Sequence, residues 1–169
     1  MKKVMKNLIL VACIGKKNEL GINNDLIWKF AEDLQTFRSI TAGAHIVMGR
    51  NTFFSLPKML PGRKHLVIAH TPDGLPDEVV IFQSVEAFIE FAESYNDIIY
   101  VIGGGVIYKE LLPYCEKLIL TEVDATYDGG VDCIYFPEFR RINYTVTSSE
   151  DFVDLESQIK YTRNVYVRT

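Results

Sequence analysis

The chain of 169 residues has 48% hydrophobic and 24% charged side chains, which suits one globular domain over residues 1–169 that buries about two thirds of its unfolded surface. Eighteen Lys and Arg against 22 Asp and Glu leave a net charge of -4, without a basic block. This balance excludes a nucleic-acid partner held by phosphate contacts, and the 12% aromatic content excludes a disordered or fibrous chain.

The first predicted element is an apolar strand over residues 8–14. Three lysines precede it between residues 2 and 6, and Cys13 lies near its end, which imitates a lipoprotein signal. The apolar part before the cysteine, residues 8–12, is shorter than the ~7 to 15 residues of a signal core. We therefore interpret this segment as a strand of the fold.

The cysteines indicate a reducing environment. There are three of them, Cys13, Cys115 and Cys133, widely spaced and without a Cys-x-x-Cys pair, so neither a disulfide framework nor a metal site is predicted. No segment approaches the ~18 apolar residues of a membrane span. We expect a cytoplasmic protein without a membrane partner.

Apolar runs alternate with helical periodicity along most of the chain. The runs are continuous, as expected for parallel strands covered on both faces, and predict strands over 8–14, 45–48, 65–69, 79–82, 98–102 and 118–123. Helices are predicted over 31–41, 85–93 and 106–115, with a shorter one opening at Gly49-Arg50. After Pro137, polar alternation predicts an antiparallel pair over 144–152 and 159–167. This order predicts an α/β fold.

An acid interrupts the apolar stripe of the first helix. Asp33 falls among Phe30, Leu34 and Phe37, whereas Glu32 is predicted to face solvent. A carboxylate among apolar side chains needs a cationic or hydrogen-bonding partner. Asp33 is therefore either a cap of the first turn or an acid that binds a ligand. Trp28, just before this helix, is by itself more typical of a core residue than of a site.

Two strands run through glycine into a helix. The strand at 45–48 continues into Gly49, Arg50, Asn51 and Thr52, and the strand at 98–102 into Gly103, Gly104 and Gly105. Bare backbone amides at such ends favour phosphate, and the Arg50 guanidinium suits a bidentate phosphate contact. Two such ends indicate a dinucleotide with an additional ribose phosphate, as in NADPH. Read separately, the glycines are also consistent with a tight turn, and Arg50 with an ordinary surface residue.

Together these residues resemble the dihydrofolate reductases of the bacterial chromosomal type. The resemblance runs through Gly21-Ile22, Trp28, Glu32-Asp33-Leu34, Phe37, 47–53, Leu60-Pro61-Gly62-Arg63-Lys64, 101–105, Tyr108 and 120–124. It implies a mostly parallel central sheet of about eight strands, flanked by helices and closed by a C-terminal antiparallel strand. It also implies hydride transfer from NADPH to dihydrofolate, giving tetrahydrofolate, at a site that antifolate inhibitors would also bind. A monomer is taken as the default oligomeric state.

The resemblance further implies roles for individual residues. Asp33 would bind the 2-amino and N3 side of the pterin ring with support from Thr121, and Trp28 would hold a water nearby. Arg63 would clamp the α-carboxylate of the glutamate tail. The other residues implied for the substrate site are Cys13, Ile14, Leu34, Phe37, Leu56, Leu60, Ile102 and Tyr108.

The cofactor site is implied in the same way. Arg50 and its neighbours would receive the adenosine-phosphate end, and the triple glycine the pyrophosphate, with a cis peptide at Gly103-Gly104. The implied residues are Gly21, Ile22, Gly49, Arg50, Asn51, Thr52, His70, Thr71, Gly103, Gly104, Gly105, Val106 and Ile107. All three histidines are expected on the cofactor side.

The sequence departs from the family pattern in the loop over the site. Ile27 and Ala31 stand where the family usually has prolines, so a loop of residues 16–28 with fewer fixed φ angles is expected to be more flexible or differently closed. Two alternatives to the resemblance are a pyrimidine reductase of riboflavin synthesis and a nucleotide-binding module without activity. The former shares fold and cofactor but lacks the Trp28 and Asp33 pair.

Overall fold

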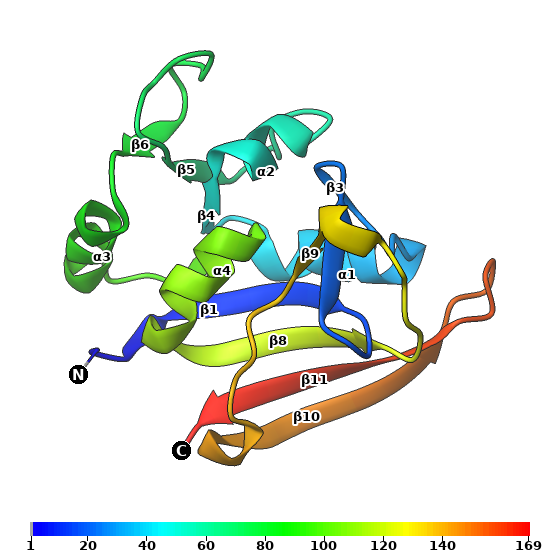
Figure 1. Cartoon of the computed structure of the whole chain (residues 1–169). Helices are drawn as coiled ribbons and strands as arrows, with labels where there is room; N and C mark the ends of the chain where they lie inside the picture. Colours follow the sequence, from blue (N-terminus) through cyan, green and yellow to red (C-terminus); the bar gives the residue numbers. More distant parts are fainter. Residues whose placement is uncertain (1) are drawn as a thin grey trace.

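A computed structural model describes residues 2–169, and its centre is one eight-stranded sheet (Figure 1). The sheet order is β10-β11-β8-β1-β7-β4-β5-β6. Its strands are β1 (Met5–Ile14), β4 (His45–Gly49), β5 (Lys64–Ile68), β6 (Val80–Phe82), β7 (Ile99–Val101), β8 (Cys115–Val123), β10 (Tyr144–Val153) and β11 (Lys160–Arg168). All neighbours from β8 across to β6 are parallel, and only β10 and β11 join in antiparallel fashion. The predicted mostly parallel sheet is confirmed.

Helices cover both faces of this sheet, which explains why its central strands are apolar throughout. The helices are α1 (Ala31–Thr41), α2 (Arg50–Ser55), α3 (Val85–Ser94) and α4 (Gly105–Leu111). In Figure 1, α4 crosses in front of β1 and α1 lies behind it. Leu8, Leu10, Val47 and Val101 are completely buried between these layers. None of the helices in residues 2–169 is long and apolar enough to span a bilayer.

One predicted helix is shorter than expected. The segment 106–115 was predicted as a single helix, but α4 ends at Leu111 and a 3₁₀ turn, Leu112–Tyr114, leads into β8. Pro113 explains the change, because its ring lacks an N–H and clashes with the carbonyl four residues earlier. Cys115 is therefore the first residue of β8, and it is completely buried.

A second, three-stranded sheet has no counterpart in the prediction. It consists of β2 (Glu19–Ile22), β3 (Asp25–Leu26) and β9 (Cys133–Tyr135), in the order β3-β2-β9. Single 3₁₀ turns precede β9 (Gly130–Asp132) and β10 (Arg141–Asn143). These strands are too short to leave a period of two in the sequence. The small sheet joins two loops that are more than a hundred residues apart.

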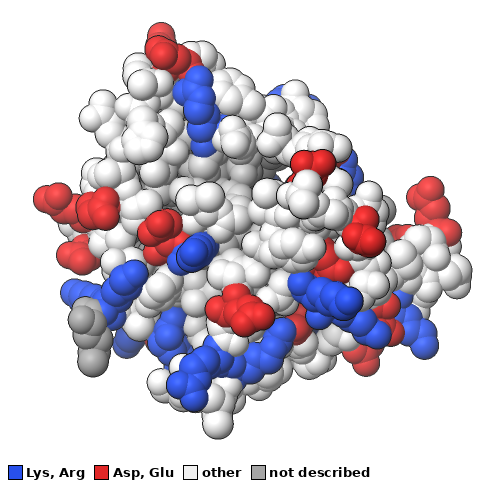
Figure 2. Space-filling model, viewed as in Figure 1, with Lys and Arg blue, Asp and Glu red and all other residues white. Residues whose placement is uncertain are grey.

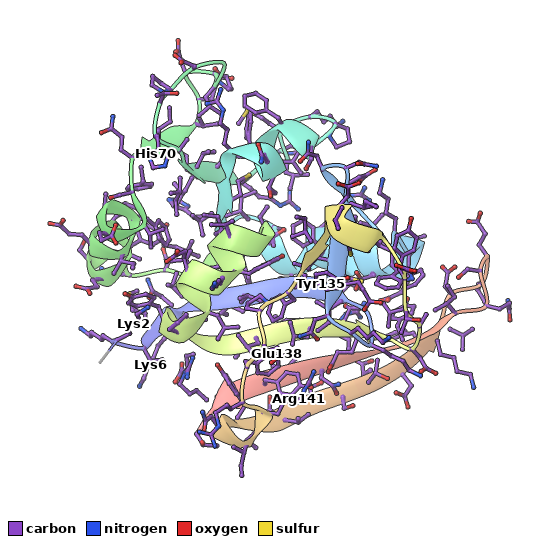
Figure 3. All side chains as sticks on the ribbon, viewed as in Figure 1. Lys2, Lys6, His70, Tyr135, Glu138 and Arg141 are labelled. Atoms are coloured by element: carbon purple, nitrogen blue, oxygen red, sulfur yellow. The ribbon has the colours of Figure 1, made fainter. Side chains whose placement is uncertain are left out.

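Charges of both signs are distributed over the surface. On the face seen in Figure 2, Lys and Arg alternate with Asp and Glu, and several basic side chains gather along its lower edge. Among the ion pairs of the described residues is Arg141 with Glu122, whose atoms Nη2 and Oε1 are 2.8 Å apart. Arg141 is labelled in Figure 3, at the lower strands β10 and β11.

Candidate active site

Asp33 projects from the first turn of α1 onto the central sheet. Its Oδ1 accepts a hydrogen bond from Thr121 Oγ1 at 2.5 Å and another from Arg163 Nη2 at 2.8 Å. The N-cap of α1 is Phe30, and no side chain caps the helix. The cap hypothesis for Asp33 is therefore wrong. The carboxylate, whose side chain is 16% exposed, instead joins α1 to β8 and β11.

Glu32 was predicted to face solvent, and its side chain is 41% exposed, but it is also paired with the sheet. It forms a bidentate pair with Arg163, at 2.7 Å from Nη2 to Oε1 and 3.1 Å from Nη1 to Oε2, and accepts a hydrogen bond from Tyr161 Oη at 2.8 Å. The Arg163 hydrogen bonds are the main reason why the pKa of Glu32 falls to about 2. The helical pattern missed the ion pair because Arg163 comes from β11, 131 residues further along the chain.

Trp28 closes one end of the same region. Its ring is buried with Phe30, Val123 and Tyr161, and Cys13 packs against this cluster. A Cβ on Gly15 would lie 2.3 Å from the indole, so only glycine lets the ring approach the backbone at the end of β1. Burial raises the pKa of the Cys13 thiol. The tryptophan thus belongs to a core cluster that adjoins Asp33 through α1.

The predicted apolar side chains of the substrate site divide into two groups. Leu34 and Phe37 are half-buried on α1, and Leu56, Leu60 and Ile102 are half-buried against the cluster around Met48 and Phe53. Ile14 and Tyr108 are buried in the main core, where Tyr108 Oη donates to the carbonyl of Val11 at 2.7 Å. The half-buried residues retain apolar surface for a ligand, and all seven assignments stay predictions.

Arg63 is held in place by three hydrogen bonds. Nε donates to Thr41 Oγ1 at 2.9 Å, Nη1 to the Pro61 carbonyl at 2.6 Å and Nη2 to the Arg38 carbonyl at 2.6 Å. A guanidinium has five N–H groups, so two remain for a ligand. The loop before β5 is thereby fastened to the end of α1, and a half-buried fork with unused donors suits a carboxylate.

His65 supports this loop. Its Nε2 accepts a hydrogen bond from the Leu60 amide, and its Nδ1 lies against the Arg63 carbonyl, both at 3.0 Å. The ring can accept at Nε2 and donate at Nδ1 only when it is neutral. Burial lowers the pKa of His65, which favours that form. Whether His65 lies on the cofactor side, as expected for all three histidines, stays a prediction.

The two glycine-containing strand ends meet in the structure. Strands β4 and β7 are parallel neighbours, and beyond their ends the Gly49 amide donates to the Gly103 carbonyl at 2.9 Å. The peptide between Gly103 and Gly104 is cis, as predicted. No side chain caps α2 or α4, so their first amides have no capping partner. The backbone here presents unused donors to an anion.

Arg50 lies beside the loop that follows β5. Its Nη1 donates to the Thr71 carbonyl at 3.3 Å and its Nη2 to the Asp73 carbonyl, while the guanidinium lies 5.1 Å from the Phe54 ring centre. His70 is exposed at the start of this loop and is labelled in Figure 3. Asn51 is exposed and Thr52 half-buried on α2. These residues form a polar end to the site, suited to an additional phosphate.

The remaining residues predicted for the cofactor divide by burial. Ile107 is buried in the core, and a Cβ on Gly49 would contact it at 3.1 Å, whereas Val106 is 73% exposed. Ile22 pairs with Asp25 of β3 and Cys133 of β9 in the small sheet. Their contacts with a cofactor stay predictions, as does that of Gly21 beside Ile22.

The loop over the site is tied to the rest of the molecule by a carboxylate that the sequence analysis missed. Glu19, 1% exposed, accepts hydrogen bonds from the Lys17 amide at 2.7 Å and the Tyr127 amide at 2.6 Å. The Lys16 amide donates to the Ala125 carbonyl at 3.0 Å. Part of the segment expected to be flexible is thus paired, although the effect of Ile27 on its motion stays a prediction. No local pattern distinguishes Glu19 from a surface glutamate.

Replacing Glu19 by Gln is expected to lower the free energy of unfolding by about 1–2 kcal/mol, because the amide offers one oxygen where the carboxylate serves two N–H donors. Urea denaturation measures this loss. The exposed Glu156→Gln variant is the control and should leave the midpoint unchanged. Equal midpoints for both variants would show that Glu19 does not fasten the loop.

Comparisons with known proteins agree with this geometry. The profile of the family described as dihydrofolate reductase matches residues 7–168. The dihydrofolate reductase of Bacillus subtilis is 34% identical over 131 residues, covering 78% of this chain and 76% of that protein. The enzyme of the same name from Buchnera aphidicola subsp. Acyrthosiphon pisum is 37% identical over 142 residues, covering 83% and 85%.

A solved structure supports the same assignment. Dihydrofolate reductase from Enterococcus faecalis, complexed with NADP(H) and RAB-propyl, superposes with a TM-score of 0.85 at 27% identity and covers 96% of each chain. The sequence profile, the relatives and the structure therefore agree over nearly the whole length. The chain belongs to the dihydrofolate reductase family.

Proposed function

We propose that the chain catalyses the NADPH-dependent reduction of 7,8-dihydrofolate to 5,6,7,8-tetrahydrofolate, with Asp33 binding the pterin ring. The observation that carries this proposal is the carboxylate of Asp33, held by Thr121 at the sheet while its second oxygen, Oδ2, makes no hydrogen bond within residues 2–169. A carboxylate with an oxygen left unoccupied can accept hydrogen bonds from a 2-amino group and a ring N–H. Trp28 would hold a water beside the same ring.

The cofactor site lies at the joined ends of β4 and β7. NADPH supplies the hydride when bound. The bare backbone at Gly103 and Gly104 and the uncapped first turns of α2 and α4 fit a pyrophosphate, and the free N–H groups of Arg50 fit a ribose phosphate. Thr71, whose carbonyl accepts a hydrogen bond from Arg50, and His70 before it in the chain are assigned to the adenosine end.

The proton for N5 of the pterin comes from water in this mechanism. Among the titratable neighbours of Asp33, Glu32 is held as a carboxylate by Arg163, while burial raises the pKa of both Cys13 and Tyr161. None of these three groups is a useful acid near neutral pH. Asp33 therefore assists by orienting the ring and by placing negative charge where it favours the protonated substrate.

A direct assay tests the reaction. Purified protein is mixed with NADPH, and the decrease of NADPH absorbance is followed with and without dihydrofolate. The proposal requires a decrease only when both are present, together with formation of tetrahydrofolate. Binding of NADPH without turnover would instead indicate a nucleotide-binding module.

Arg63 is proposed to bind the glutamate tail, and its loss should affect only substrates that carry one. Replacing Arg63 by Leu is expected to raise the KM for dihydrofolate about 10-fold, the value of one charge-assisted contact, and to leave the KM for a pterin without glutamate nearly unchanged. Steady-state kinetics with both substrates measures the difference. Lys64→Leu, which removes an exposed charge from the next residue, is the matched control. A uniform rise for both substrates would remove Arg63 from the site.

The setting of the enzyme is part of the same proposal. We assign it to the cytoplasm as a monomer that binds dihydrofolate and antifolate inhibitors. The cysteines support the compartment, because Cys13, Cys115 and Cys133 are all free. Size-exclusion chromatography with light scattering tests the oligomeric state.

A further inference from the structure

Arg163 is the only cation that the described residues place on Asp33, and it is almost as buried as the core. Its side chain, on β11, is 10% exposed, and its guanidinium lies 4.8 Å from the ring centre of Phe152 on β10. In the sheet, Arg163 is the register partner of Thr121 on β8. The two donors to Asp33 Oδ1 therefore come from neighbouring positions on adjacent strands.

The hydrogen bonds of Arg163 are divided unequally between the two carboxylates. Glu32 receives two of them, from Nη1 and Nη2, whereas Asp33 receives one, from Nη2. Glu32 also accepts from Tyr161 Oη at 2.8 Å and from Thr36 Oγ1 at 2.6 Å. Four donors keep Glu32 ionised. This agrees with its pKa of about 2, for which the hydrogen bonds from Arg163 are the largest cause. One guanidinium between two carboxylates leaves one negative charge at the site.

This division has a consequence for the ligand. Arg163 and Thr121 both bind Oδ1 of Asp33, and no described residue binds Oδ2. We propose that Arg163 is a positioning residue for dihydrofolate, which holds Oδ1 of Asp33 so that Oδ2 is presented to the pterin ring. Glu32 neutralises the charge of Arg163, so that the negative charge of Asp33 remains available to the ligand. This inference rests on the proposed role of Asp33 in binding the ring.

The other groups that face Asp33 do not compete for this charge. Cys13 approaches from β1 and Tyr161 from β11, and burial is the first cause that raises the pKa of each. Both stay neutral through the range in which the enzyme would work. Glu32, Asp33 and Arg163 are therefore the charged groups that determine how the site responds to pH.

Two variants change the net charge of the groups around Asp33 in opposite directions. Arg163→Met leaves two neighbouring carboxylates without a cation, so the affinity for dihydrofolate should fall about 10-fold at neutral pH. The fall of dihydrofolate affinity at low pH, called here the acid limb, should begin about one pH unit higher in this variant. The reason is that neighbouring like charges favour proton uptake. In Glu32→Gln, the charge of Arg163 is shared with no carboxylate other than Asp33. A nearby cation disfavours proton uptake, so the acid limb should move to lower pH. Quenching of the sole tryptophan, Trp28, by dihydrofolate measures affinity in both, and KM and kcat are measured alongside.

Matched variants separate positioning from a structural role. Arg168→Met removes another β11 arginine, one that donates to the Leu112 and Cys115 carbonyls, so it should lower stability without moving the pH profile. The double variant of Arg163→Met with Glu32→Gln should bring the acid limb back toward that of the parent. Shifts of the single variants in the same direction, or none, would overturn the proposal.

Asp33→Asn separates the role of Asp33 from that of Arg163. If that variant binds dihydrofolate as tightly as the parent, the role of Asp33 itself fails. If Asp33→Asn weakens binding while Arg163→Met leaves both affinity and pH profile unchanged, the role of Asp33 stands and that of Arg163 is rejected. Affinity for NADPH, whose site lies at β4 and β7, should be unchanged in every variant and reports that each one is folded.

Discussion

Asp33→Asn should lower kcat/KM for dihydrofolate by at least about 10² at neutral pH, within the range of acid-base assistance. The amide keeps the shape of the carboxylate, and its oxygen can still accept from Thr121 and Arg163. Its NH2 group then occupies the position of Oδ2 and presents donors to the 2-amino group and ring N–H of the pterin. The variant loses both the negative charge and the acceptor, while Arg163 keeps its pair with Glu32, so the fold should persist.

The pH profile of hydride transfer, measured by single-turnover kinetics, checks the mechanism as well as the residue. In the parent, the rate should fall as pH rises, because the protonated substrate complex is lost. The Asn variant should recover partly toward acid, where the solvent protonates the substrate without help. If the variant transfers hydride like the parent at neutral pH, Asp33 is structural and the mechanism is wrong.

The fold was predictable because its signals are local. Continuous apolar runs such as residues 45–48 and 98–102 indicate strands buried on both faces, and β4 and β7 are such strands. Helix α1 has the predicted bounds, and α3 begins where Ser84 accepts a hydrogen bond from the Ala87 amide. Pro113 interrupts α4 in a way that periodicity alone does not show.

The chemistry of the site was predictable only where residues act with their sequence neighbours or match the family. Asp33 in an apolar stripe needs a partner, and Thr121 was named from the resemblance. Arg163 and Glu19 left no such signal, because the former meets Asp33 from 130 residues away and the latter meets Tyr127 from 108 residues away. Such pairs are decided by how strands are ordered in the sheet, which a single sequence does not contain.

Cofactor choice provides the second large effect. Arg50→Leu should weaken NADPH binding by about 1.5–3 kcal/mol, the contribution of a charge-assisted hydrogen bond, and leave NADH almost unchanged. The reason is that only NADPH carries the ribose phosphate that the free N–H groups of Arg50 can bind. Equilibrium binding of both cofactors to the parent and the variant measures the effect.

The NADH arm is needed because Arg50 also has structural contacts. Its bonds to the Thr71 and Asp73 carbonyls and its place over Phe54 hold the loop after β5, so the Leu variant also loosens that loop. A loosened loop weakens both cofactors, whereas a missing phosphate contact weakens only NADPH. Arg50→Lys retains the charge but not the planar fork, so it should recover part of the NADPH affinity. Equal losses for the two cofactors in Arg50→Leu would mean that this arginine supports the loop and does not select the cofactor.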